Sequence, residues 1–272
     1  SYREVVGISV SEGRFTGEIE YLRLGQGPPL LMLGRGADAA NPTGMARRMA
    51  VSGLGLLPDH FTVYLAAMPS GLADGSSMRD IATRYTAGIE EAFDGPVLAY
   101  GVSSGGMILL PVVIDQPHLI RRMVLAGTSC RHSPQGRRWN ADAVQAIRAG
   151  DYRTALAAMS APMVARRWRG PVAALAWLAG PLLFTGDPTD TIVELEAEIA
   201  MDLEPDLHRI PVPALLIGAS EDAWYPPELV RRTATGRPLG QAVILSQASH
   251  SQAISAREAT AIALGYLLAD QQ

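Results

Sequence analysis

The sequence predicts an α/β fold, with a mostly parallel sheet of about eight strands, helices on both faces and an inserted helical cap. Three observations predict it. Short apolar runs alternate with helical patterns at both ends of the chain, about eighty central residues contain helical patterns without a convincing strand, and a Gly-x-Ser-x-Gly motif lies where an apolar run meets a helix. With 272 residues, 48% of them hydrophobic, the chain is long enough to bury one large core.

The first elements are expected to be strands. Residues 4–10 and 18–24 predict a pair of antiparallel strands, because apolar and polar side chains alternate there. Residues 30–33 are all apolar and predict the first buried strand. A helix is expected over residues 42–49, since Pro42 is tolerated at a first helical position.

The later elements repeat the strand and helix alternation, which predicts parallel strands with helices on both faces. Pro111 is expected to kink the helix behind the serine motif or to end it early. We expect further strands over residues 61–68, 97–102, 122–126, 214–217 and 242–245, and helices over residues 78–93 and 256–269.

Residues 1–128 and 209–272 are expected to form the core, and residues 129–208 the helical cap. Such an insertion lies over the carboxyl ends of the strands, where these sheets bind ligands. Three of the four tryptophans fall in the cap. Some apolar cap side chains are expected to seal the cap onto the core, and a pocket roofed by the others favours an apolar acyl or alcohol group. The cap residues in question are Trp139, Trp168, Trp177, Met159, Met163, Leu182, Leu183 and Phe184.

The motif places Ser103 between Gly101 and Gly105. A sharp turn from strand to helix strains the backbone at the serine and crowds the positions two before and two after, so both must lack a side chain. The apolar run over residues 96–100 and the helical pattern over residues 106–110 fit this turn. The pattern predicts that Ser103 is a nucleophile, and the alternative is a structural Gly-Ser turn.

A serine hydroxyl needs a neighbouring base, and the base needs an acceptor that fixes its tautomer. His250 follows the expected strand 242–245, whereas the other four histidines precede the second half of the sheet. Asp222 follows the strand 214–217 and is the expected acceptor, with Glu221 as the rival acid.

The order Ser103, Asp222, His250 resembles that of the α/β-hydrolase superfamily, in which nucleophile, acid and histidine follow one another along the chain. The resemblance extends from residue 30 to the last helix. The family's spacing of glycine, acid and proline falls on Gly218, Asp222 and Pro226, which favours Asp222 over its neighbour.

The resemblance also implies an oxyanion hole made by the backbone N–H groups of Ser104 and Arg35. Where the family often has His-Gly, this chain has Leu33-Gly34, a difference that affects the bracing of the loop. The guanidinium of Arg35 has two further interpretations: it holds a substrate carboxylate, or it is solvated and pins the loop.

Four residues are expected to line the substrate pocket: Gly34, His132, Trp168 and Trp224. For His132, at the expected hinge of the cap, the alternative is a structural role. Trp224 and Tyr225 directly follow the acid, so they either line the pocket or pack the acid loop. Cys130 is expected to be packed at the hinge.

The charges of the cap are divided, with arginines early and carboxylates late. Two solvated helix faces that pair with each other explain the division, and the alternative is an entrance for anionic substrates or a docking surface for an acyl-carrier protein. The early group is Arg131, Arg137, Arg138, Arg148, Arg153, Arg166, Arg167 and Arg169, and the late group is Asp187, Asp190, Glu194, Glu196, Glu198 and Glu204.

The net charge of −4 gives no basic field for nucleic acid, and the apolar stretch 171–185 is too short to cross a membrane. All 23 basic residues are arginine, which together with many Ala, Gly and Pro is typical of GC-rich bacterial coding. The sequence has no pattern of metal ligands. We expect a cytoplasmic protein without cofactor or metal, whose partner is a small apolar acyl substrate.

These residues predict a serine hydrolase that cleaves a carboxylic ester, lactone or thioester through an acyl-enzyme intermediate. Hydrolysis of a carbon–carbon bond and acyl transfer to an alcohol are alternatives on the same triad. A ligand receptor without catalysis is an alternative of another class, because a fold alone does not specify function. In the superfamily that this chain resembles, epoxide hydrolases and haloalkane dehalogenases use Asp at the position of Ser103. The serine at this position therefore argues against those two activities.

Overall fold

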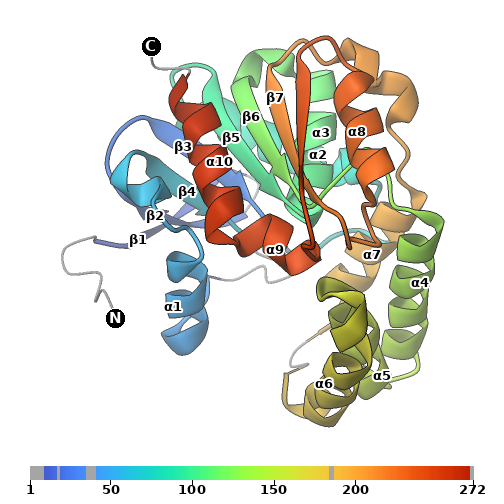
Figure 1. Cartoon of the computed structure of the whole chain (residues 1–272). Helices are drawn as coiled ribbons and strands as arrows, with labels where there is room; N and C mark the ends of the chain where they lie inside the picture. The colour runs from blue at the N-terminus through green and yellow to red at the C-terminus, as the bar shows by residue number, and fades with distance from the viewer. Residues whose placement is uncertain (1–8, 17–18, 35–40, 184–186, 270–272) are drawn as a thin grey trace.

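The computed structural model describes residues 9–16, 19–34, 41–183 and 187–269. Its core is one eight-stranded sheet with the order β1-β2-β4-β3-β5-β6-β7-β8 (Figure 1). The six strands from β3 to β8 pair in parallel, and β1 and β2 are antiparallel to their neighbours. The predicted fold class is thereby confirmed. The strands are β1 Ser11–Phe15, β2 Ile19–Leu24, β3 Pro29–Leu33, β4 Thr62–Ala66, β5 Val97–Val102, β6 Ile120–Ala126, β7 Ala214–Ala219 and β8 Gly240–Leu245.

Two predicted boundaries near the N-terminus are wrong. Residues 1–8 lie outside the described part, Ser9 and Val10 are not in a strand, and the partner of β2 is Ser11–Phe15. The first helix, α1, is Gly44–Ser52 with Thr43 as its N-cap, so Pro42 precedes the helix and does not open it.

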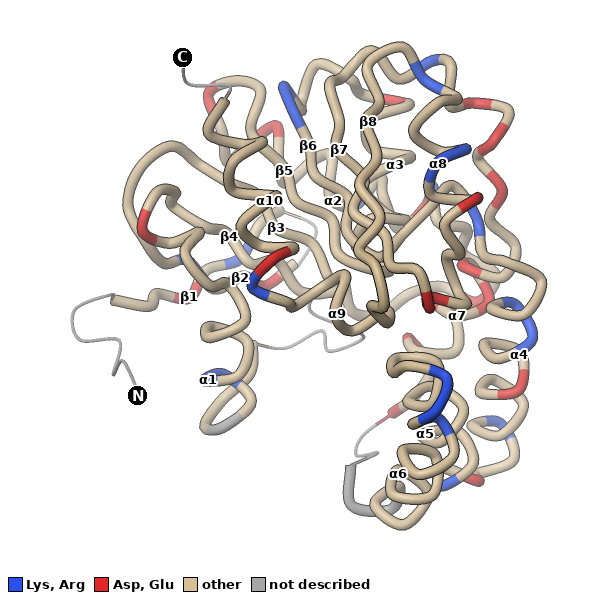
Figure 2. Tube along the Cα trace, viewed as in Figure 1, with Lys and Arg blue, Asp and Glu red and all other residues tan. Residues whose placement is uncertain are grey.

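The two faces of the sheet bury separate apolar clusters. In β3, Leu31 and Leu33 pack in the cluster that contains helices α2 (Met78–Ala92) and α3 (Ser104–Asp115), whereas Leu30 and Met32 pack in the cluster that contains α10 (Arg257–Leu268). Alternate side chains of a strand point to opposite faces, so one apolar strand serves both clusters. Helices cover both faces, as Figure 1 shows, and charged residues are nearly absent from the central strands in Figure 2.

Helix α3 does not end at Pro111, contrary to one of the two expected effects; it continues to Asp115. Proline inside a helix removes a hydrogen bond and costs about 3 kcal/mol. Every residue from Gly105 to Ile114 is buried, and burying one large apolar side chain contributes about 1.5–3 kcal/mol. Several such side chains therefore outweigh the loss, and the helix is held by its packing between sheet and neighbours.

The cap consists of α4 (Pro134–Arg148), α5 (Tyr152–Ser160), α6 (Arg169–Leu183) and α7 (Thr189–Ala200), and the described part of residues 129–208 contains no strand. Helices α4 and α7 lie next to the core, and α5 and α6 extend away from it (Figure 1). A small apolar cluster holds the cap together, with Ala143, Val144, Ile147, Ala155 and Leu195 at its centre. The remaining helices are α8 Pro227–Thr235, on the side of α3, and α9 His250–Ser255.

Candidate active site

The turn between β5 and α3 places Ser103 at a strained position. Its φ is +52° and its ψ is −123°, a conformation that side-chain-bearing residues rarely adopt. A Cβ on Gly101 would lie 2.6 Å from the Cα of Gly106, and a Cβ on Gly105 would lie 2.3 Å from the carbonyl of Leu33. The glycines are therefore required by close backbone contacts, and the turn projects Ser103 at the carboxyl edge of the sheet.

His250 lies within hydrogen-bond distance of both Ser103 and Asp222. The Oγ of Ser103 is 3.1 Å from Nε2 of His250, and Nδ1 of His250 is 2.7 Å from Oδ2 of Asp222. His250 and Asp222 are buried, at 0% and 3% exposure. Nδ1–H donates to the carboxylate in this arrangement, which leaves the Nε2 lone pair directed at the serine hydroxyl.

The carboxylate of Asp222 is itself held in place. Its Oδ1 accepts hydrogen bonds from the backbone N–H groups of Trp224 at 3.0 Å and Tyr225 at 3.1 Å. The rival acid Glu221 points elsewhere, since its Oε2 accepts from the backbone N–H of Arg166 in the cap. The acid loop thus directs only Asp222 toward the imidazole.

Ser104 is the first residue of α3, so its backbone N–H has no intrahelical partner and the positive end of the helix lies there. Gly34 faces the turn from the end of β3: its φ is +127°, and a Cβ on it would lie 2.4 Å from the carbonyl oxygen of Val102. Arg35, the other expected donor, lies outside the described residues.

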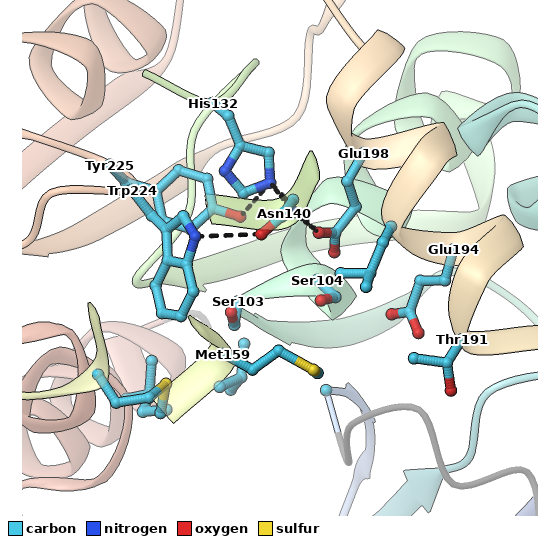
Figure 3. Close-up of a pocket in the computed structure, with 15 residues that line it drawn as sticks. Ser103, Ser104, His132, Asn140, Met159, Thr191, Glu194, Glu198, Trp224 and Tyr225 are labelled. Carbon is cyan, nitrogen blue, oxygen red and sulfur yellow. Dashed lines mark hydrogen bonds and ion pairs between the residues drawn. The ribbon is translucent and has the colours of Figure 1, made fainter. Parts of the chain in front are cut away.

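A cavity of about 340 Å³ opens in front of Ser103, between the sheet edge and the cap (Figure 3). Of the four expected pocket residues, Gly34, His132 and Trp224 line it. Trp168 does not; it lies in the short helical turn Arg166–Trp168, in which no residue is buried, and it is 55% exposed. The cavity is lined by Gly34, Val102, Ser103, Ser104, His132, Asn140, Met159, Met163, Thr191, Glu194, Leu195, Glu198, Trp224, Tyr225 and Ile254.

His132 belongs to a buried polar network. Its Nε2 is 3.3 Å from Oε2 of Glu198 and 3.3 Å from the hydroxyl of Tyr225, and its ring stacks on that of Tyr225 with centroids 4.8 Å apart. The amide nitrogen of Asn140 donates to the same Glu198 oxygen at 2.8 Å. Trp224 donates from Nε1 to Oδ1 of Asn140 at 3.2 Å, and its ring packs edge-on against His250.

Two carboxylates in the cavity were not expected from the sequence. Glu194 and Glu198 lie one turn apart on α7 and are 4% and 3% exposed, although the charge pattern suggested a solvated face. Burial raises the pKa of Glu194 well above its usual value, the nearby charge of Glu198 adds to this rise, and a hydrogen bond with the Ser104 side chain opposes it. The apolar neighbours Val193 and Ala197 on α7 were the available signal that this helix is buried.

Some of the other charged residues of the cap form ion pairs between the early arginines and the late carboxylates, as two helix faces that pair with each other would. Arg148 pairs with Glu196 at 2.8 Å, and Arg131 pairs with Glu204 at 3.2 Å. Asp190 instead accepts hydrogen bonds from the backbone N–H groups of residues 71 and 72 and ties α7 to the core. Arginines of the early group thus pair with carboxylates of the late group. Glu194 and Glu198 differ from these carboxylates because they are buried in the cavity.

Among the described residues, no group of three or more His, Cys, Asp or Glu side chains is placed to hold a metal ion. Cys130 is buried, and burial raises the pKa of its thiol. None of the helices in the described ranges has both the length and the apolar character needed to span a bilayer.

Comparison with known proteins finds a family match and many similar structures. The family described as serine aminopeptidase, S33, matches residues 74–251. The enol-lactonase of Burkholderia xenovorans is similar over 95% of this chain and 100% of its own, with a TM-score of 0.73 and 21% identity. A thermophilic esterase of Thermogutta terrifontis is similar over 96% of this chain and 98% of its own (TM-score 0.68, 19% identity), and a bromoperoxidase of Bacillus anthracis over 95% and 100% (TM-score 0.72, 18% identity).

Proposed function

Because the chain belongs to the serine aminopeptidase S33 family of α/β-hydrolases, we propose that it cleaves a carboxylic ester, lactone or thioester through an acyl-enzyme intermediate. The chain is an enzyme of the hydrolase class. The single observation that supports this chemistry best is the pair of distances that link Ser103 to His250 and His250 to Asp222, 3.1 and 2.7 Å.

In the first step, Nε2 of His250 takes the proton of the Ser103 hydroxyl while Oγ forms a bond to the substrate carbonyl carbon. The negative charge that develops on the carbonyl oxygen is held by the backbone N–H of Ser104, with that of Arg35 as the second donor proposed from the family resemblance. His250 then gives the proton to the departing oxygen or sulfur, and the bond from carbon to the leaving group breaks.

In the second step, His250 takes a proton from water while the water oxygen forms a bond to the acyl carbon. His250 then returns this proton to Oγ of Ser103 as the bond between Oγ and the acyl carbon breaks, which releases the acid and restores the serine. Asp222 accepts from Nδ1 throughout and stabilises the imidazolium. The ring centroids of Trp224 and His250 lie 4.9 Å apart in an edge-on arrangement, and His250 is fully buried. Apolar side chains, namely Val102, Met159, Met163, Leu195 and Ile254, line one part of the cavity and suit a small acyl group.

The test is treatment with a fluorophosphonate, followed by mass analysis of the peptide that contains Ser103, and turnover of 4-nitrophenyl esters. We expect one adduct on Ser103 and loss of turnover in Ser103→Ala. Ester turnover that persists in this variant contradicts the assignment of the nucleophile, and absence of both adduct and turnover favours the receptor alternative. A panel of lactones and thioesters at matched concentration then ranks the leaving groups.

A further inference from the structure

The cavity in front of Ser103 has two different walls. One wall is apolar and comes from β5, the cap and α9. The other is polar and buried, and it consists of His132, Asn140, Glu194, Glu198 and Tyr225 (Figure 3). A pocket for a purely apolar acyl group needs no such wall, because burying polar groups costs free energy unless each is hydrogen-bonded.

Glu198 has one oxygen that is fully engaged and one that is not. Its Oε2 accepts from Asn140 at 2.8 Å and lies 3.3 Å from His132. Its Oε1 is buried and has no hydrogen-bond partner among the described residues. Figure 3 shows the carboxylate of Glu198 directed into the cavity. A buried carboxylate oxygen without a donor is unfavourable by about 1–3 kcal/mol or more, so the fold keeps it there at a cost.

The partners of Glu198 fix its orientation. The indole N–H of Trp224 can only donate, so the oxygen of Asn140 faces Trp224 and the amide nitrogen faces Glu198. His132 is held by its stacking on Tyr225, and Nε2–H is the tautomer that donates toward Glu198. The free oxygen is therefore a preorganised acceptor and not a loosely placed side chain.

The position of Glu198 on its helix adds to the cost. It lies in the last turn of α7, which ends at Ala200, and the negative end of a helix disfavours a carboxylate. One turn earlier, burial and the nearby Glu198 raise the pKa of Glu194 well above its usual value, which favours its protonated form. The polar wall thus contains one buried acceptor oxygen, Oε1 of Glu198, that has no partner among the described residues.

We propose that Glu198 determines specificity by accepting a hydrogen bond, through Oε1, from an O–H or N–H donor on the acyl group of the substrate. This inference rests on the proposed acyl-enzyme function. The acyl group of the substrate stays at Ser103 during both acylation and deacylation. A hydrogen bond to this group can therefore affect the rates of both steps. Hydroxyl-bearing and ammonium-bearing acyl groups share the donor chemistry, and a carboxylate-bearing acyl group is repelled.

The experiment compares four 4-nitrophenyl esters whose acyl groups have nearly the same shape: 3-hydroxybutanoyl, 3-aminobutanoyl, 3-methoxybutanoyl and 3-methylbutanoyl. The first two donate a hydrogen bond, the third only accepts and the fourth is apolar. Both enantiomers of each chiral ester are measured. The enzymes are the wild type, Glu198→Gln and Glu196→Gln; Glu196 lies on the same helix but pairs with Arg148.

For the wild type and Glu196→Gln, we expect kcat/KM for at least one donor ester to exceed that for 3-methylbutanoyl by roughly tenfold or more, as for a hydrogen bond to a charged group. Glu198→Gln presents an N–H to the cavity, so this preference should vanish and the 3-methoxy ester should gain. The ratio between the hydroxy and amino esters shows which donor is preferred. We also expect a higher Tm for Glu198→Gln, whereas a merely structural role predicts a lower one.

A wild-type preference near one for both donor esters, unchanged by Glu198→Gln, overturns the inference. The apolar ester separates this result from failure of the proposed function. If 3-methylbutanoyl is hydrolysed by the wild type and not by Ser103→Ala, the acyl-enzyme function stands whatever the donor preference is.

Discussion

The substitution Asp222→Asn tests how the acid directs the imidazole. An asparagine of the same shape can still accept from the backbone N–H groups of Trp224 and Tyr225, which now bond Oδ1 at 3.0 and 3.1 Å. Its amide N–H₂ then takes the position of Oδ2, 2.7 Å from Nδ1 of His250. Because N–H₂ donates, Nδ1 must become the acceptor and the ring proton moves to Nε2.

With the proton on Nε2, His250 cannot take the proton of Ser103, although the 3.1 Å distance is unchanged. Loss of the correct tautomer lowers kcat by about 10⁴-fold in a serine triad, which equals about 5.5 kcal/mol at about 1.36 kcal/mol per factor of ten. Folding should change less, by about 1–3 kcal/mol for one altered hydrogen bond to a charged group.

The assay measures kcat/KM on a 4-nitrophenyl ester, with the rate of fluorophosphonate labelling and Tm on the same samples. The matched control is Glu221→Gln, one residue earlier, whose carboxylate contacts the backbone of Arg166 and not the triad; it should stay within about twofold of the wild type. Activity of Asp222→Asn within tenfold of the wild type, or an equal loss in the control, refutes the reasoning.

Four further substitutions test the packing and the buried charges. Gly105→Ala should abolish ester turnover and strongly lower Tm, because the added Cβ would lie 2.3 Å from the Leu33 carbonyl. Its control, Gly265→Ala, places the Cβ in open space on α10 and should stabilise the protein by up to about 1 kcal/mol. Equal Tm values for the two variants contradict this reasoning. Burial raises the pKa of Glu194 in the folded protein. The contribution of Glu194 to the free energy of unfolding is therefore fully present below the ordinary glutamate pKa and is lost as the pH rises through the raised, folded-state pKa. The Tm of Glu194→Gln minus that of the wild type should therefore grow as the pH rises above the ordinary glutamate pKa, and a constant difference argues against the raised pKa. Burial lowers the pKa of Arg237 to about 10, and its guanidinium has no hydrogen-bond partner among the described residues. Arg237→Met should therefore raise the free energy of unfolding, measured with urea at neutral pH, by about 1–3 kcal/mol. A lower free energy of unfolding would show that the guanidinium has a partner.

The core of the fold could be predicted because its signals are local. The strand over 97–102 has the predicted bounds and the helix after Ser77 has the predicted start, since a continuous apolar run and a capping serine each act within a few residues. The edge strand β1 was misplaced, because its alternating pattern is weak and only pairing with β2 fixes its position. The early helix end expected at Pro111 is absent, because burial of α3 outweighs a local helix signal.

Predictions for the site divide in the same way. Ser103, Asp222 and His250 each follow a strand, so the topology of a parallel sheet is enough to bring them to one edge. The inner face of the cap is set by how its helices turn, and this depends on contacts between α4, α7 and the acid loop. For that reason Trp168 was wrongly expected in the pocket, while Asn140 and the two glutamates of α7 were missed.

The triad and the polar wall are parts of one chain of hydrogen bonds. Asp222 accepts from the backbone of Trp224, the indole of Trp224 donates to Asn140, and Asn140 donates to Glu198. Every side chain in this series is buried, so breaking one link leaves an unpaired polar group at about 1–3 kcal/mol. The cap helices α4 and α7 are therefore bound to the acid loop through polar contacts that require a defined geometry, unlike apolar packing. The loop that orients the imidazole of His250 also orients the acceptor proposed to recognise the acyl group, so a cap rotation that moved Glu198 would disturb the support of Asp222 as well.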